Sequence, residues 1–242
     1  VEGPKGSGSE YTIVDETGKE LFNTKRQHNQ ISDTHFTSKV DGQKYDIQFE
    51  GDKITVTKEG NGETEAETVT LDSSQLDPEL ISLYKQLPGD MLFNLAKFKI
   101  KVKLGYEENN ACFSPAENTI YISKELANVP FTFAHEYGHA IDFHYSRPNI
   151  PELRKDPEFI KIYNEELENF ISRSASSDLD AISYFVHHDG ANPLGEFIAE
   201  TTALISGLSD NTGHLGVRSV VLQQNFPRAI AYIAKAQSAY LA

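Results

Sequence analysis

The first third of the chain consists of short runs in which apolar and polar residues alternate, a pattern typical of strands. These runs occupy residues 11–14, 35–40, 45–50, 53–57 and 67–71. Asp41-Gly42, Gly51-Asp52 and Asn61-Gly62 stand between them, and such dipeptides are typical of tight hairpin turns. Residues 1–9 resemble a linker or a cloning scar. Residues 10–72 are therefore expected to form a small antiparallel β-rich domain.

The pattern changes at residue 73. Ser73 or Ser74 can cap a helix to residue 84, and a second helix is expected at residues 89–96. Strands at 98–104, 111–113 and 119–122 precede a strongly apolar helix that opens at Pro130. A helix from Asp156-Pro157 to residue 170, a serine-rich linker at 172–177 and three further helical segments follow. Strands first and helices later predict an α+β fold, with residues 73–242 as the second domain.

Charge and composition narrow the classes of function. The 242 residues include 22 Lys and Arg against 36 Asp and Glu, a formal net charge of −14. A protein that binds nucleic acid by neutralising phosphates needs the opposite balance, so no nucleic-acid partner is expected. No apolar run reaches the length of about 18 residues that a membrane span requires. A single cysteine, Cys112, excludes an internal disulfide, and oligomeric state stays open.

The residues that carry chemistry lie in the apolar helix that opens at Pro130. Residues 131–145 read FTFAHEYGHAIDFHY, with His135, Glu136 and His139 in the arrangement HExxH. A spacing of four residues places both imidazoles on one face of a helix, where they can bind one metal ion. Glu136 lies beside them and can act on a metal-bound water as a general base. This group predicts a catalytic metal site.

A catalytic zinc site needs three protein ligands and one open position. A third histidine at the usual offsets after His139 is absent, because Asp142 and Tyr145 occupy the relevant places. The remaining source is a carboxylate on a later helix, expected at residues 196–208. Glu196 and Glu200 are four residues apart there, so one can bind the metal while the other accepts a hydrogen bond from a ligating imidazole.

The segments HEYGHAID, DPEF and EFIAET together resemble the catalytic domain of the anthrax lethal factor-like metallopeptidases, which include secreted bacterial Pro-Pro endopeptidases. The resemblance covers roughly residues 73–208. It implies a zincin-like domain with a mixed sheet and an active-site helix. It also implies one Zn²⁺ per chain held by His135, His139 and Glu196, with Glu200 supporting a ligand. A secreted or delivered, toxin-like extracellular protein is then expected, without its leader in this chain.

In that family a tyrosine shortly before the glutamate ligand helps to stabilise the oxyanion. The nearby tyrosine here is Tyr184, twelve residues before Glu196, which is further than the family pattern. The intervening loop contains Gly and Pro and can still bring Tyr184 to the site. His187 or His188 is the alternative donor to the oxyanion.

A possible substrate strand precedes the motif helix. Asn110, Ala111, Cys112 and Phe113 resemble the edge strand beside the cleft of related peptidases. An extended peptide would pair with this strand through backbone N–H and C=O groups. An ordinary hairpin is equally consistent with these residues.

The sequence thus predicts a zinc-dependent endopeptidase that cleaves a protein or peptide substrate with a zinc-activated water. One alternative is a catalytically inactive binding or toxin-adaptor protein of metallopeptidase fold. The intact His135, Glu136 and His139 count against it. A metal-dependent hydrolase of a non-peptide bond is the other alternative, and the peptide-like edge strand disfavours it.

Overall fold

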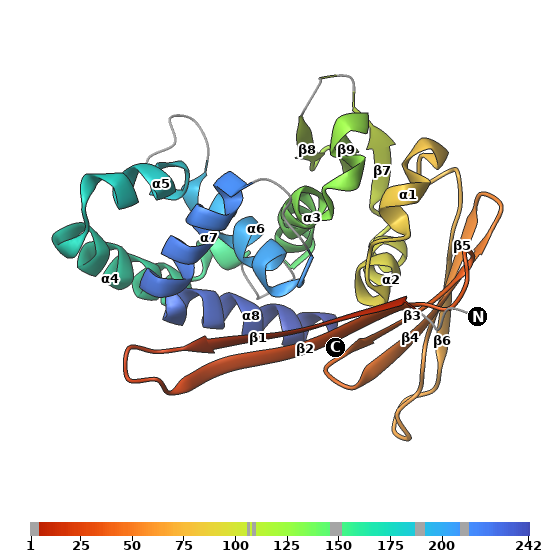
Figure 1. Ribbon diagram of the computed structural model, residues 1–242, viewed down its shortest axis with the longest axis horizontal. Coiled ribbons are helices and arrows are strands. Elements are labelled where there is room, and N and C mark those ends of the chain that lie inside the picture. The colour runs from red at the N-terminus through yellow and green to blue at the C-terminus, as the bar shows by residue number, and fades with distance from the viewer. Residues whose placement is uncertain (1–4, 106, 108–109, 146–151, 187–191, 209–212) are drawn as a thin grey trace. The chain divides into compact units, whose positions relative to one another are not determined.

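The computed structural model describes residues 5–105, 107, 110–145, 152–186, 192–208 and 213–242. Its fold is α+β, as predicted, with a six-stranded sheet, a three-stranded sheet and a series of helices (Figure 1). The chain divides into two compact units, one made of residues 1–11 and 24–130 and the other of residues 12–23 and 131–242. The boundary expected after residue 72 lies inside the first unit, because α2 (Gly89–Lys97) packs on strands β3 to β6.

The six-stranded sheet follows the order of the sequence. Its strands are β1 (Lys5–Val14), β2 (Glu20–Gln30), β3 (His35–Val40), β4 (Gln43–Glu50), β5 (Lys53–Lys58) and β6 (Glu67–Leu71). Ile47 of β4 lies opposite Val56 of β5, and Val56 lies opposite Val69 of β6. Alternate positions therefore share one face of the sheet. The predicted hairpin glycines Gly42 and Gly51 have φ angles of 87° and 64°, which glycine adopts without steric cost.

Two expectations for the start of the chain are wrong. Residues 5–9, expected as a linker, form the first half of β1. Strand β2 was not predicted at all, because its sequence ELFNTKRQHNQ is polar on both faces and lacks clear alternation. Its pairing with β3, which places His28 opposite Ser38, gives this strand its place in the sheet.

The first predicted helix begins later than expected, whereas α2 begins at Gly89 as predicted. Residues 78–84 form a short 3₁₀ helix, η1 (Pro78–Leu80), and a single turn, α1 (Ile81–Tyr84). Asp77 caps this segment by accepting a hydrogen bond from the backbone N–H of Glu79, so neither Ser73 nor Ser74 is the cap. Helix α2 lies close to the sheet at Gly89, where a Cβ atom would be 2.3 Å from Cβ of Tyr45.

The three-stranded sheet is mixed, as predicted. It consists of β7 (Lys101–Leu104), β8 (Ala111–Ser114) and β9 (Thr119–Ile122), and a 3₁₀ helix, η2 (Lys124–Asn128), follows it. Strand β9 is central, parallel to β7 and antiparallel to β8. β7 is shorter than the predicted strand at residues 98–104, because Lys99 has a φ angle of 55°.

The second unit is helical apart from residues 12–23. Its elements are α3 (Pro130–Tyr145), η3 (Leu153–Lys155), α4 (Pro157–Arg173), α5 (Ser176–Val186), α6 (Pro193–Ile205), α7 (Gly213–Asn225) and α8 (Pro227–Leu241). The described part of the chain thus has four helices after α4, where three were predicted, and the serine-rich linker is shorter than expected. Buried aromatic rings join α4, α6 and the start of α8, including Tyr163, Phe197 and Phe226.

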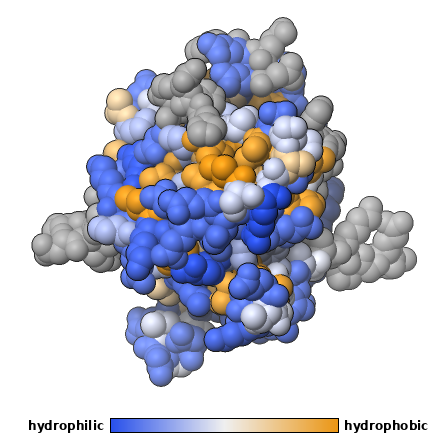
Figure 2. Space-filling model, turned by 90° about the vertical axis from the view of Figure 1, so that its left-hand side faces the viewer, coloured by the Kyte–Doolittle hydropathy of each residue, from blue (hydrophilic) through white to orange (hydrophobic). Residues whose placement is uncertain are grey.

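The helices of the second unit expose a few large apolar side chains, namely Phe143 on α3, Ile171 on α4, and Val217 and Val220 on α7. Figure 2 shows apolar side chains gathered near the middle of one face, surrounded by hydrophilic ones. Within the described residues, every helix is too short or too polar to cross a membrane.

Candidate metal centre

Two helices of the second unit carry the ligand candidates. Helix α3 opens with Pro130, which suits the first turn of a helix, and is buried along most of its length. Helix α6 begins at Pro193, three residues earlier than predicted, because the side chain of Asn192 accepts a hydrogen bond from the backbone N–H of Gly195. Glu196 therefore lies in the first turn of α6, where the helix dipole favours a carboxylate.

The structure brings the three predicted ligands together. One potential ligand atom from each of His135, His139 and Glu196 lies within 4.8 Å of the others. Oε2 of Glu196 is 3.1 Å from Nε2 of His135 and 3.4 Å from Nε2 of His139. The exposed fractions of the three side chains are 13%, 24% and 14%, so the cluster is largely shielded but open to one side.

Glu200 lies one helical turn beyond Glu196 and takes a different position. Its side chain is 1% exposed, and its Oε2 atom accepts a hydrogen bond from Nδ1 of His135 at 2.9 Å. This bond fixes the ring so that Nε2 of His135 faces Glu196. Spacing alone left both glutamates as ligand candidates, and the resemblance assigned the ligand role to Glu196. The structure places Glu196 at the cluster and Glu200 behind it, hydrogen-bonded to His135.

A close approach of the two helices makes this arrangement possible. Gly138 of α3 lies against α6, and a Cβ atom added there would be 2.7 Å from Cα of Ala199 and 2.9 Å from Cβ of Thr202. Any larger residue would therefore push α6 away from α3. The glycine between the two motif histidines thus sets the distance between the imidazoles and Glu196.

Two further predicted residues lie near the cluster. Glu136 is 8% exposed, and its charge acts on both His135 and Tyr184. Tyr184, near the end of α5, donates a hydrogen bond from its hydroxyl group to Glu196. Tyr184 and Glu196 are therefore in contact despite the twelve-residue interval between them in sequence.

The ionisation of these groups reflects burial and mutual contacts. Burial alone would lower the pKa of His135, but its bonds to Glu196 and Glu200, together with nearby negative charge, raise that pKa to about 10. Burial favours a raised pKa for Glu196, yet the two imidazoles hold it well below its usual range. Burial, followed by the bond to Glu196, raises the pKa of Tyr184. Glu196 is thus a carboxylate and Tyr184 a protonated phenol at neutral pH.

Two of the predicted site residues, His187 and His188, fall outside the described residues. Asp142 on α3 is buried, and its Oδ1 atom accepts a hydrogen bond from the backbone N–H of Leu153. Burial raises the pKa of Asp142 to about 6. Asp142 thus ties the first residue of η3 to helix α3.

Strand β8, predicted as a substrate strand, is an edge strand of the three-stranded sheet. The N–H of Ser123 donates to the carbonyl of Asn110. In an antiparallel pair every second residue bonds to the neighbouring strand, so the N–H and C=O of Cys112 also point toward β9. The backbone groups of Ala111 and Phe113 consequently point away from β9, toward the edge of the sheet.

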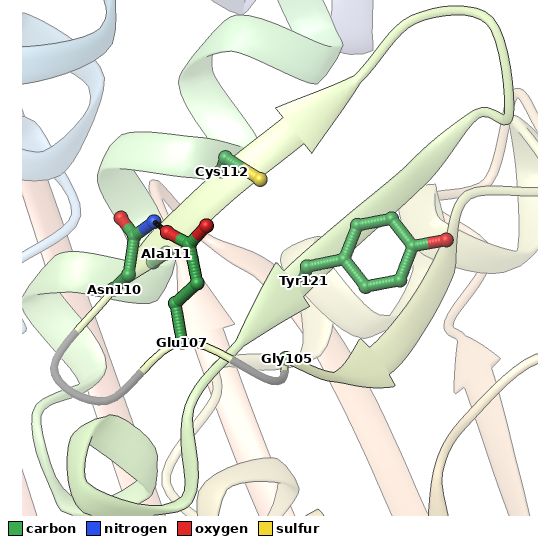
Figure 3. Close-up of a pocket in the computed structure, with 6 residues that line it drawn as sticks. All are labelled: Gly105, Glu107, Asn110, Ala111, Cys112 and Tyr121. Atoms are coloured by element: carbon green, nitrogen blue, oxygen red, sulfur yellow. Dashed lines mark hydrogen bonds between the residues drawn. The ribbon is translucent and has the colours of Figure 1, made fainter.

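A hollow lies beside this edge strand, within the first unit. Its volume is about 430 Å³, and the residues lining it are Gly105, Glu107, Asn110, Ala111, Cys112 and Tyr121 (Figure 3). Nδ2 of Asn110 donates a hydrogen bond to Oε2 of Glu107 at 2.6 Å. Cys112 and Tyr121 are cross-strand partners, so their side chains share one face of the sheet. Three of the four residues predicted for the substrate strand therefore border a hollow.

Sequence reasoning did not single out Gly138 or Arg218. Gly138 is visible in the motif as the one residue without a side chain, but its importance depends on α6, which only the fold places against it. Arg218 on α7 packs against Tyr184, and no spacing or motif indicates that contact. Both were missed because helix pairing cannot be deduced from one helix alone.

Comparisons with known proteins give no relative for this chain. No protein-family model, no curated protein and no solved structure matches it. A function for the cluster therefore has to be argued from its own residues.

Proposed function

We propose that this protein is a zinc-dependent endopeptidase whose metal is held by His135, His139 and Glu196. The convergence of two imidazoles and one carboxylate within 4.8 Å is the observation that carries the proposal. Two histidines and a glutamate are a ligand set of catalytic zinc sites that keep one position open. The resemblance of the motif segments to lethal factor-like metallopeptidases supports the same ligand set.

The atoms around His135 are suited to a bound metal ion. Both ring nitrogens of His135 lie within 3.1 Å of carboxylate oxygens. Without a metal, this arrangement needs a doubly protonated imidazole, whose positive charge the two carboxylates stabilise, as the raised pKa of His135 reflects. A metal ion would supply that positive charge in place of the proton on Nε2. With a metal, Nε2 becomes a ligand while Nδ1–H still donates to Glu200, the usual support for a ligating histidine.

The surrounding residues then have distinct roles. A bound zinc ion would polarise a water molecule and the scissile carbonyl group. Glu136 accepts a proton from the attacking water and passes it to the leaving amine. Tyr184 donates its hydroxyl hydrogen to the carbonyl oxygen as negative charge develops there. Separately, within the first unit, strand β8 has outward backbone groups at Ala111 and Phe113 that are suited to pair with an extended peptide.

The substitution Glu136→Gln tests this proposal. Because Glu136 acts as a base and not as a ligand, the variant should bind as much zinc as the wild type and lose hydrolysis of a peptide library. Elemental analysis and mass-spectrometric detection of cleaved peptides measure the two properties. A wild-type protein that holds zinc but cleaves no peptide would instead favour the inactive binding protein.

A further inference from the structure

Arg218 on α7 makes an unusual contact close to the proposed active site. Its guanidinium carbon lies 5.6 Å from the ring centroid of Tyr184 and 5.5 Å from that of Phe185. The side chain is half-buried, and among the described residues it forms no ion pair. A planar cation over two aromatic faces is a favourable arrangement that lysine reproduces only in part.

The two rings differ in how firmly the fold holds them. Phe185 is 1% exposed, and its carbonyl oxygen accepts a hydrogen bond from the hydroxyl group of Tyr163 at 2.7 Å. Tyr184 is only half-buried and meets Phe185 edge-on, with centroids 5.3 Å apart and planes at 87°. Arg218 therefore links a ring fixed in the core to a ring at the site.

The orientation of Tyr184 matters because its hydroxyl group reaches Glu196. Tyr184 lies in the last turn of α5, which ends at Val186. A rotation about its Cα–Cβ bond would carry the hydroxyl group out of reach of the cluster. A small displacement of a catalytic group costs a large factor in rate.

We propose that Arg218 is a positioning residue that holds the Tyr184 ring so that its hydroxyl group points at the metal cluster. The inference rests on the proposed function, because the turnover that Arg218 supports is that of the peptidase. Arg218 acts through Tyr184 and not on the substrate, and this distinction can be measured.

Kinetics of two variants provide the first test. Arg218→Met keeps the apolar stem and removes the planar cation, and it should lower kcat about tenfold with KM and zinc content nearly unchanged. Arg218→Lys keeps the charge but not the planar group, so its kcat should lie between that of Arg218→Met and that of the wild type. Arg228→Met is a matched control, because Arg228 pairs with Glu165 at the surface, and its kcat should stay within about twofold of wild type.

A double variant separates positioning from direct action. If Arg218 works only through Tyr184, adding Arg218→Met to Tyr184→Phe should lower kcat no further. An additive loss, or a rise in KM alone, would show that Arg218 contacts substrate and would overturn the inference.

A spectroscopic measurement tests the inference without requiring that the protein cleave a peptide. In protein labelled with 3-fluorotyrosine, the ¹⁹F signal of Tyr184 is identified by its loss in Tyr184→Phe. In Arg218→Met this signal should move toward that of free fluorotyrosine, while it stays in place in Arg228→Met and the circular dichroism is unchanged. If the Tyr184 signal does not move in Arg218→Met, the inference is wrong, whether or not the protein cleaves peptides. If the signal moves but the wild-type protein cleaves no peptide, only the proposed function is contradicted.

Discussion

Tyr184 is the predicted site residue about which the structure adds most to the sequence. From sequence, the twelve-residue interval to Glu196 left it in competition with His187 and His188. In the fold its hydroxyl group donates to Glu196, and burial keeps the phenol protonated. A protonated phenol can donate a hydrogen bond across neutral pH, which a histidine near its pKa cannot do as steadily.

The substitution Tyr184→Phe should therefore lower kcat about a hundredfold, the loss typical of removing one oxyanion donor. KM and zinc content should change little, because the hydrogen bond to the oxyanion forms only in the transition state. Steady-state kinetics and metal analysis of the same preparation measure both effects. Unaltered turnover, together with a pH profile that follows a histidine, would transfer the role to His187 or His188.

His28 in the first unit is a second residue with a clear dependence on pH. Its Nε2–H donates to the carbonyl of Lys85 at 3.0 Å, and Nδ1 lies 2.9 Å from Oγ of Ser38. Oγ of Ser38 also accepts the N–H of Gly89, so neutral His28 completes a chain of hydrogen bonds between strand and helix. Burial lowers the pKa of His28 below 6.5, although the Lys85 carbonyl and the charge of Asp90 oppose this.

Because the folded state lowers this pKa, the stabilising contribution of His28 is present above pH 6.5 and is lost as pH falls through the folded-state pKa. Urea unfolding between about pH 8 and pH 5 should show wild type losing more stability than His28→Gln, whose amide cannot titrate. Comparing the two proteins cancels the contributions of the other histidines. Parallel stability curves would contradict this account.

At the scale of elements, the contact between α3 and α6 determines the site. In an exposed helix, replacing glycine by alanine is stabilising by about 0.5–1 kcal/mol. At Gly138 a Cβ atom would be 2.7 Å from Cα of Ala199, so overpacking should reverse the sign and cost about 1–3 kcal/mol.

Gly138→Ala should also weaken zinc binding, because Glu196 moves with α6. Gly216→Ala on α7 is the matched control, since a Cβ atom there meets nothing within 4 Å. Thermal unfolding and competition with a chromophoric chelator measure stability and affinity. Zinc affinity equal to wild type in Gly138→Ala would mean that the helix spacing does not control the metal ligands.

The elements also show what sequence patterns could and could not provide. Strands β3 to β6 were predicted because their apolar residues alternate and Asp-Gly, Gly-Asp and Asn-Gly turns separate them. Strand β2 was missed because polar residues occupy both its faces. Helix α6 begins three residues before the predicted start, because Asn192 caps it ahead of Pro193 and a cap residue resembles a loop residue in sequence. Patterns of neighbouring residues thus predicted whether a segment is a helix or a strand more accurately than they predicted where it begins and ends.

For the whole molecule, sequence identified which residues meet but not how the fold brings them together. Spacing of four placed His135 and His139 on one face, and Glu196 was expected to join them through the resemblance. Glu200 was likewise expected to accept a hydrogen bond from a ligating imidazole, and it lies 2.9 Å from Nδ1 of His135. The closeness set by Gly138 and the packing of Arg218 on Tyr184 depend on contacts between helices distant in sequence, which no local pattern indicates. The boundary after residue 72 was placed by a change of pattern, whereas packing of α2 joins both sides in one unit.

The amount of zinc bound per chain, measured by elemental analysis of protein purified without chelator, tests the central claim most directly. We expect about one zinc per wild-type chain, since the ligand set forms one open site. Glu196→Ala should lose the metal, whereas Glu200→Ala should bind it with affinity reduced about 10- to 100-fold. If wild-type protein contains no transition metal and gains none when zinc is added, His135, His139 and Glu196 form a metal-free group and the proposed function is wrong.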